Sequence, residues 1–415
     1  MSTVTKTHLC RFLLIFFAST AAFAQTAKEG CLPIGVCLDP AGRSFDVGNM
    51  PLAMIASPEG DRIVLSLNGW REQGIQVVDP QSGSVVQTIT QPSAFLGLAF
   101  SPDGQTLYAS GGNEDVVYRY AWRDKRATLI DHIELAHKEP KKDGTRFPAG
   151  IAVSRDGKYL FVAENIGDAL AVVDVAHKRV VQRVNTERYP YAVALSPAGD
   201  VYVSAWGGTT VSVFSAANGM LRERGGVQAG RHPSALLLNR DASRLFVTSA
   251  STNTIAVVDT KTLRVIATLQ DPAPRGPNEG STPNGLALSS DGSRLYVAEA
   301  DNNAVAVFEL SASSAGSAGS RGADRLLGRI PAGWYPAAVL LTRDSLFVLN
   351  GKGRGTRPNP DFPTPDKPLP PDSTSYTLGQ LNGTITALPA DVSTNDLAQL
   401  TKRVERANNW DKTPA

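Results

Sequence analysis

The sequence has few of the residues from which most catalytic and metal sites are built. Its 415 residues include three cysteines and five histidines. Apart from His8, the histidines are spread along the chain, at His132, His137, His177 and His232, and no Gly-x-Ser-x-Gly motif occurs. This spacing indicates neither a three-histidine metal centre nor a Ser-His-Asp triad. The composition therefore favours binding over catalysis, and no bound cofactor is expected.

The sequence also lacks an excess of charge of either sign. It has 41 basic and 39 acidic residues, and 39 of each once residues 1–24 are set aside. Proteins that bind the phosphate backbone of nucleic acids depend on a basic footprint. Nucleic acid is therefore not the expected partner, although a local patch of arginine and aromatic residues is compatible with single strands.

The apolar run near the N-terminus is too short to span a membrane. It covers residues 12–17, follows Lys6 and Arg11, and precedes the small-x-small motif Ala22-Phe23-Ala24. This arrangement predicts a signal peptide over residues 1–24 and a periplasmic or secreted protein with no membrane span after cleavage. Cys31 and Cys37 then remain in an oxidising compartment, where we expect a disulfide that fixes an N-terminal arm, residues 25–41.

What the sequence does have is one phrase repeated along its length. One copy reads Ile151-Ala-Val-Ser-Arg-Asp-Gly-Lys-Tyr-Leu-Phe-Val-Ala-Glu164. Two alternating apolar strands flank an Asp-Gly turn, which is typical of a β-hairpin. The copies align at seven anchors, 42 to 53 residues apart: Ser57, Ser101, Ser154, Ser196, Asn239, Ser289 and Thr342. With a third and a fourth strand after each hairpin, the pattern predicts an all-β fold, a seven-bladed β-propeller over residues 42–389.

The two ends of the propeller are expected to pair. The seventh repeat has three strands, at residues 337–341, 345–349 and 384–388, and then changes to a helical pattern. Residues 42–48 form a spare strand, which we expect to complete the seventh blade and remove its exposed edge. The C-terminal segment, residues 390–415, begins with a capping-box pattern at Ser393 and predicts a short amphipathic helix that packs on the propeller or on another domain.

Most long loops are predicted on one face of the ring, where six residues precede a proline at the start of a blade. Proline fixes these corners, so the preceding side chains point in repeatable directions. The candidate ligand-binding residues are Arg146, Phe147, Glu164, Arg188, Tyr189, Trp206, Arg231, His232, Glu299, Trp334, Tyr335, Lys352 and Arg354. Convergent arginines and aromatic rings favour a planar or anionic ligand.

Three alternatives remain for this face. In the first alternative, the aromatic residues only fill the space between neighbouring blades, and the arginines are solvated or pair with Glu164 and Glu299. A divalent cation at the channel mouth, held by Glu164 and other oxygens, would instead indicate a hydrolase. In the segment 350–360, glycines alternate with Lys352, Arg354 and Arg357, which suits either an anion or an interdomain contact but lacks the spacing of a phosphate-binding P-loop.

The repeats resemble the YVTN (YncE-like) family of secreted bacterial β-propellers, through Leu160-Phe-Val-Ala163, Leu245-Phe-Val-Thr248 and Leu295-Tyr-Val-Ala298. Residues 350–360, 381–385 and 400–409 are similar to the junction in bacterial proteins that join such a propeller to an alkaline-phosphatase-like phosphoesterase domain. In those proteins the catalytic residues lie beyond the junction. The resemblance implies a propeller without its phosphoesterase domain, so no catalytic residue carries over.

Together these patterns predict a secreted, monomeric binding scaffold that acts through its loop-rich face. Its expected partner is a small anionic or aromatic ligand, or an envelope or secreted protein such as a separately encoded phosphoesterase. The alternative function is a metal-dependent propeller hydrolase of the lactonase kind.

Overall fold

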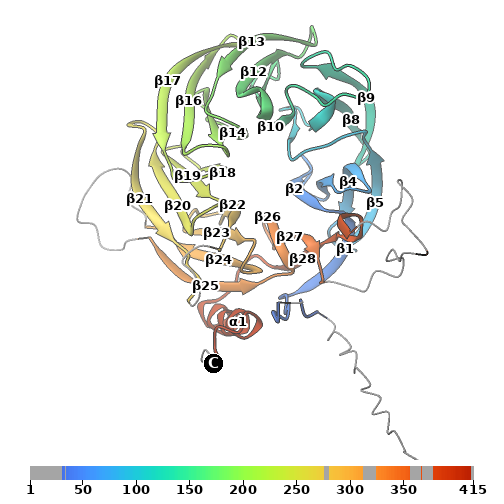
Figure 1. The fold of residues 1–415 in the computed structure, drawn as a ribbon. Helices are drawn as coiled ribbons and strands as arrows, with labels where there is room; N and C mark the ends of the chain where they lie inside the picture. The colour runs from blue at the N-terminus through green and yellow to red at the C-terminus, as the bar shows by residue number, and fades with distance from the viewer. Residues whose placement is uncertain are drawn as a thin grey trace, which may run out of the picture.

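The computed structural model describes residues 30–32, 34–274, 280–311, 324–355, 366 and 377–412. It consists of seven four-stranded antiparallel sheets, which are arranged as a ring about a central axis in Figure 1. The prediction of a seven-bladed β-propeller is confirmed. The predicted signal peptide, most of the serine-rich segment 311–322, and Arg357 lie outside the described residues.

The first strand of each blade lies innermost and the fourth lies outermost (Figure 1). Blade one contains β2 (Pro51–Ala56), β3 (Ile63–Asn68), β4 (Gln73–Asp79) and β5 (Ser84–Thr90). Blade two contains β6 (Leu98–Phe100), β7 (Thr106–Ser110), β8 (Val116–Arg123) and β9 (Arg126–Glu134). Blade three contains β10 (Pro148–Val153), β11 (Tyr159–Glu164), β12 (Ala169–Asp174) and β13 (Arg179–Asn185).

The remaining blades repeat this order, except that the last takes its fourth strand from the N-terminus. Blade four contains β14 (Pro190–Leu195), β15 (Asp200–Ala205), β16 (Thr210–Ala217) and β17 (Met220–Gln228). Blade five contains β18 (Pro233–Leu238), β19 (Arg244–Ser249), β20 (Thr254–Asp259) and β21 (Arg264–Gln270). Blade six contains β22 (Pro283–Leu288), β23 (Arg294–Glu299), β24 (Ala304–Glu309) and β25 (Arg325–Pro331). Blade seven contains β26 (Trp334–Leu341), β27 (Ser345–Gly353), β28 (Asn382–Pro389) and β1 (Arg43–Asn49).

Strand β1 closes the ring as the sequence predicts. It pairs antiparallel with β28, and Phe45 lies opposite Ile385. Arg354 holds the same strand, because its Nε donates to Asp46 Oδ1 at 2.8 Å and its Nη2 donates to the Ser44 carbonyl at 3.0 Å. The hydrophobic core lies between neighbouring blades, and Phe45 and Ile385 belong to the cluster between blades seven and one.

Helix α1 (Thr394–Ala407) packs on the protein's own propeller, against the outer strand β25 (Figure 1). Ser393 caps it, accepting a hydrogen bond from the Asp396 amide at 3.1 Å. Leu397 and Val404 are 1% exposed, and Leu397 joins the cluster between blades six and seven. No helix in the described part of the chain is long and apolar enough to cross a membrane.

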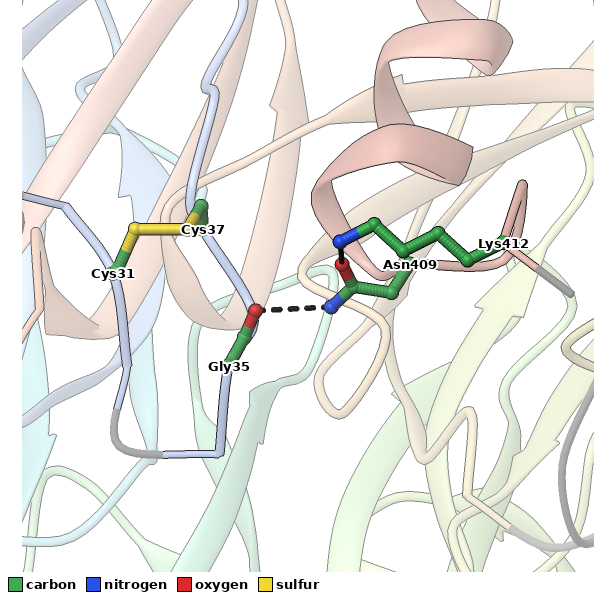
Figure 2. Close-up of a disulfide and its surroundings, with 5 residues drawn as sticks. All are labelled: Cys31, Gly35, Cys37, Asn409 and Lys412. Atoms are coloured by element: carbon green, nitrogen blue, oxygen red, sulfur yellow. Dashed lines mark hydrogen bonds between the residues drawn. A yellow bond between two sulfur atoms is a disulfide. The ribbon is translucent and has the colours of Figure 1, made fainter. Parts of the chain in front are cut away.

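The N-terminal arm contacts the C-terminal end of this helix. A disulfide joins Cys31 to Cys37, and the Cys37 amide donates to the Ala407 carbonyl at 3.1 Å. Figure 2 shows the next contact, in which Asn409 Nδ2 donates to the Gly35 carbonyl at 2.9 Å. The two ends of the chain are therefore tied together twice, through β1 and through this arm.

Candidate functional site at the mouth of the central channel

The corners that precede the first strands have an uncommon backbone conformation. All six residues that stand before a proline have a left-handed backbone, with φ of 48° at Met50, 53° at Phe147, Tyr189 and His232, 49° at Thr282 and 62° at Tyr335. This conformation costs a residue with a side chain about 1–2 kcal/mol. Such strain persists only where the surroundings enforce it, and it is common at functional sites.

Hydrogen bonds from the preceding blade hold several of these corners. The carboxylate of Asp115 accepts from the amides of Thr145, Arg146 and Phe147 at 2.6–2.9 Å. Asp168 Oδ1 accepts from the Tyr189 amide at 2.9 Å, and Asn303 Oδ1 accepts from the Tyr335 amide at 3.0 Å. The corner side chains are thus fixed in direction before any ligand arrives.

The corners surround a cavity of about 650 Å³ at the open end of the channel. All seven blades contribute to its wall. Near the mouth it is lined by Met50, Phe95, Asn165, Trp206, Ser251, Thr282 and Tyr335, and further in by Met54, Leu96, Leu236, Leu286 and Val339. This volume is in the range of small-molecule sites in proteins.

One hydrogen-bonded pair at the wall has the composition of a catalytic dyad. His232 Nδ1 and Ser251 Oγ share a hydrogen bond, and Ser251 lines the cavity. The imidazole stacks on Trp206 with the ring centroids 4.9 Å apart and the planes at 23°. A base within reach of a hydroxyl, with its ring orientation fixed by a neighbour, is the arrangement that activates serine.

The aromatic candidates divide between the cavity and the wall behind it. Trp206 and Tyr335 line the cavity, whereas Phe147 lies behind Phe95, with their ring centroids 5.3 Å apart. Burial raises the pKa of Tyr335, and burial raises the pKa of Tyr191, another lining residue, to about 12. Both phenols therefore stay neutral at physiological pH.

Among the cationic candidates, Arg188, Arg231 and Lys352 lie on the rim, outside the described residues that line the cavity, whereas Arg354 lies away from the mouth, against the outer strand β1. The Arg188 guanidinium lies 5.0 Å from the centroid of the Tyr189 ring. Lys352 Nζ lies 4.2 Å from the Tyr335 centroid and 5.4 Å from that of Trp334. Cation–π contacts therefore hold two of the rim cations against rings.

The two candidate carboxylates, Glu164 and Glu299, are fully buried. Arg183 Nε donates to both oxygens of Glu164 at 2.9–3.0 Å, and Arg146 Nη1 lies 3.9 Å from Glu164 Oε2. Arg329 Nε contacts Glu299 in the same way at 2.8–3.1 Å. A metal ion at Glu164 would have to displace an arginine, and no group of three His, Cys, Asp or Glu within the described ranges could hold one.

Sequence reasoning missed Ser251 and Tyr191. Ser251 comes two residues after the end of β19, in the loop that also carries the backbone contact to His232. Equivalent loops place Asn165 and Trp206 at the mouth, so their alignment was the available signal. Ligand binding by the candidate residues stays a prediction.

Part of the chain matches known propeller proteins in sequence. Residues 97–223 match the family model described as "Lactonase, 7-bladed beta-propeller". The seven-bladed β-propeller protein Rv1057 of Mycobacterium tuberculosis is 35% identical over 122 residues, which is 27% of this chain and 30% of that protein. The chain thus spans less than a third of the length of this curated relative.

Solved structures resemble most of the ring. A chain of hydrazine synthase from Kuenenia stuttgartiensis is 21% identical with a TM-score of 0.57, over 74% of this chain and 94% of that one. The periplasmic gluconolactonase of Pseudomonas aeruginosa is 19% identical with a TM-score of 0.55, over 69% of this chain and 86% of that one. At these identities the likeness shows the fold, and the YVTN and phosphoesterase resemblances stay predictions.

Proposed function

We propose that the protein hydrolyses a lactone at the mouth of the central channel, with Ser251 as the nucleophile and His232 as its base. The observation that carries this proposal is the hydrogen bond between these two side chains at the wall of the cavity. The match of residues 97–223 to a lactonase family model supports the reaction class. This function takes precedence over a binding scaffold without turnover.

The proposed reaction balances within the site and water. His232 Nδ1 accepts the Ser251 proton as Oγ attacks the lactone carbonyl carbon, and the ring C–O bond then breaks. The imidazolium returns the proton to the leaving alkoxide, which opens the ring and leaves an ester on Ser251. Water, deprotonated by His232, hydrolyses this ester and regenerates the hydroxyl. The buried ion pair at Glu164 takes no part, so this reaction differs from the metal-dependent alternative.

Ring opening of a panel of γ- and δ-lactones, followed by acid release, tests the proposal. Ser251→Ala and His232→Asn should each lower kcat/KM by about 10²–10⁴-fold, the usual contribution of such groups. Asparagine tolerates the left-handed backbone of position 232, so the corner is kept. His177→Asn is the matched control, because His177 is 68% exposed on the outer side of blade three, where it contacts Asp174.

Equal activity in all three variants, or wild-type rates no higher than spontaneous hydrolysis, would reject lactone hydrolysis. We include export to the periplasm or the exterior in the proposal, because the Cys31–Cys37 disulfide needs an oxidising compartment.

A second candidate function is the binding of an anionic or aromatic ligand on the rim without turnover. It is favoured by Arg231, which is exposed and makes no hydrogen bond or ion pair with any described residue, next to His232. Replacing Arg188 and Arg231 by alanine should abolish such binding while leaving lactone hydrolysis intact. Loss of both activities together would place the two arginines in one site with Ser251. A phosphoesterase partner remains a proposal from the resemblance alone.

A further inference from the structure

The cavity changes in character from its mouth to its interior. No Asp, Glu, Lys, Arg or His is among the described residues that line it. Below the corners its described wall is mostly aliphatic, with Met54, Leu236 and Leu286 separated by small residues such as Ala192 and Ala235, and its polar side chains are Tyr191 and Asn284. Leu236 is three residues beyond Pro233 on β18, which places it about 10 Å further along the strand.

The polar side chains at the mouth are already occupied by the protein. Thr282 Oγ1 donates to Asp301, and Asn165 Nδ2 donates to the Pro190 carbonyl at 3.1 Å. Ser251 is hydrogen-bonded to His232. A polyhydroxylated ligand that entered the interior would find only Asn284 and Tyr191 as polar side chains of the described wall, so most of its hydrogen bonds to water would be lost without replacement, which costs several kcal/mol.

One side chain of the interior wall, Tyr191, is largely withdrawn from water. Tyr191 keeps part of its surface open to the cavity, yet burial raises its pKa to about 12. Desolvation of this size indicates that protein atoms surround the phenol on most sides. An alkyl chain transferred from water into such a space is stabilised by about 0.8 kcal/mol for each methylene group.

We propose that the substrate is a lactone with an alkyl chain, whose ring lies at Ser251 and whose chain extends along the channel between Leu236 and Leu286. This inference rests on the proposed function for the ring, whereas the chain site follows from the aliphatic wall. Arg188 and Arg231, which are exposed on the rim and do not line the cavity, are not part of this substrate site.

A homologous series separates the two claims. Hydrolysis is measured for δ-valerolactone and for its 6-alkyl derivatives with two to ten carbons, with gluconolactone as the hydrophilic counterpart. Binding is measured by calorimetry with the matching 6-alkyl δ-lactams, which resist hydrolysis. Both kcat/KM and lactam affinity should rise about fourfold for each methylene until the chain fills the channel. Gluconolactone should be the poorest substrate of the series.

Variants of the wall test where the chain lies. Ala235→Leu should remove the gain for long chains and should lower kcat/KM for them much more than for δ-valerolactone. Ala192→Leu makes the same change from blade four, in case the first variant does not fold. Ala217→Leu is the matched control, since Ala217 is exposed at the end of β16 and should change nothing.

Each outcome decides between the claims. Lactam affinity that is independent of chain length would overturn the alkyl-chain site, even if lactones are hydrolysed. Chain-dependent lactam binding without any hydrolysis would reject the catalytic role of Ser251 and keep the alkyl-chain site. If kcat/KM depends on chain length in both wall variants as it does in the wild type, the alkyl chain does not lie in the channel.

Discussion

Blades three and six contain the same ion pair in two different environments. In each, a glutamate at the end of the second strand, Glu164 or Glu299, meets an arginine from the fourth strand, Arg183 or Arg329. The Arg183 side chain is 33% exposed, whereas that of Arg329 is 5% exposed. Helix α1 and Trp410, whose ring lies 5.6 Å from the Arg329 guanidinium, cover the second pair.

Two further differences between blades three and six accompany the covering of the second ion pair by helix α1. Where blade three has Gln182, which bridges to Leu221 of blade four, blade six has Gly328. Where Leu135 precedes blade three, Asp271 precedes blade six and is fully buried. Gly328 is thus the position at which helix α1 approaches blade six, Asp271 lies beside Arg329, and the ion pair itself is the same in both blades. The comparison indicates that the glutamate–arginine ion pair is part of the propeller scaffold, and that the residue which makes room for helix α1 lies next to it.

The largest effect is expected from removing the cation of the covered pair. Arg329→Met leaves Glu299 and Asp271 buried without a positive charge, which typically costs about 3–5 kcal/mol. Arg183→Met should cost less, because Glu164 keeps Arg146 at 3.9 Å and the Arg183 side chain is already 33% exposed. The urea midpoints of the two variants measure the difference, and equal midpoints would show that the helix cover has no electrostatic consequence.

A smaller effect is expected when Gly328 of blade six is replaced by glutamine, the residue at the equivalent position of blade three. A Cβ at position 328 would collide with Thr401 Oγ1 of helix α1, so Gly328→Gln should displace the helix. Overpacking of this kind costs about 1–3 kcal/mol. Proteolysis within residues 391–412 should become faster, whereas Gln182→Gly in blade three should leave the helix protected. Unchanged protection in Gly328→Gln would show that the helix does not need this close approach.

The smallest effect, and one that changes with pH, is expected at Asp271. Burial, followed by the neighbouring Glu299, raises the pKa of Asp271 well above its usual value. As pH rises above the unfolded pKa of about 3.9, the unfolded chain releases this proton before the folded one does, so Asp271 increasingly destabilises the fold until its folded pKa is passed. Asp271→Asn should therefore raise Tm near neutral pH and lose this advantage in acid.

Asp291 provides the control of opposite sign. Hydrogen bonds from Ser289 and Ser293 lower the pKa of Asp291 to about 2, so its contribution is present above the unfolded pKa and is lost as pH falls through 2. Asp291→Asn should lower Tm slightly at neutral pH. A Tm difference for Asp271→Asn that is independent of pH would contradict a titrating carboxyl in blade six.

The fold was predictable because the strands and the turn of each hairpin are adjacent in the sequence and have a recognisable pattern. Asp-Gly turns and alternating strands fix the register of neighbouring strands, and the missing fourth strand of blade seven identified β1 as its replacement. The helix was predictable from its cap and apolar face. The place where the helix docks was not predictable. It depends on Gly328 in β25, which leaves space for the helix, and a glycine in a strand does not by itself indicate that a helix packs there.

The site was predictable only in part, for a similar reason. The proline corners identified the mouth and the strained residues around it. Glu164 and Glu299 were assigned to the mouth because strand alternation does not reveal an arginine 19 or 30 residues later that turns each carboxylate into the sheet. Ser251 was missed because its partner, His232, lies on a different loop and only the folded blade brings them together.

The pairing of β1 with β28 also dictates when the ring can be completed. Ser44 meets Thr386 across 342 residues of sequence, so β1 leaves the ribosome long before its partner exists. Blades one to six can form by local contacts as they emerge, whereas β1 must wait, with its hydrogen-bonding groups unpaired, until β28 has been made. Ring closure therefore comes late in the folding of the chain, and in the interval before it the edge of blade seven is open to wrong partners.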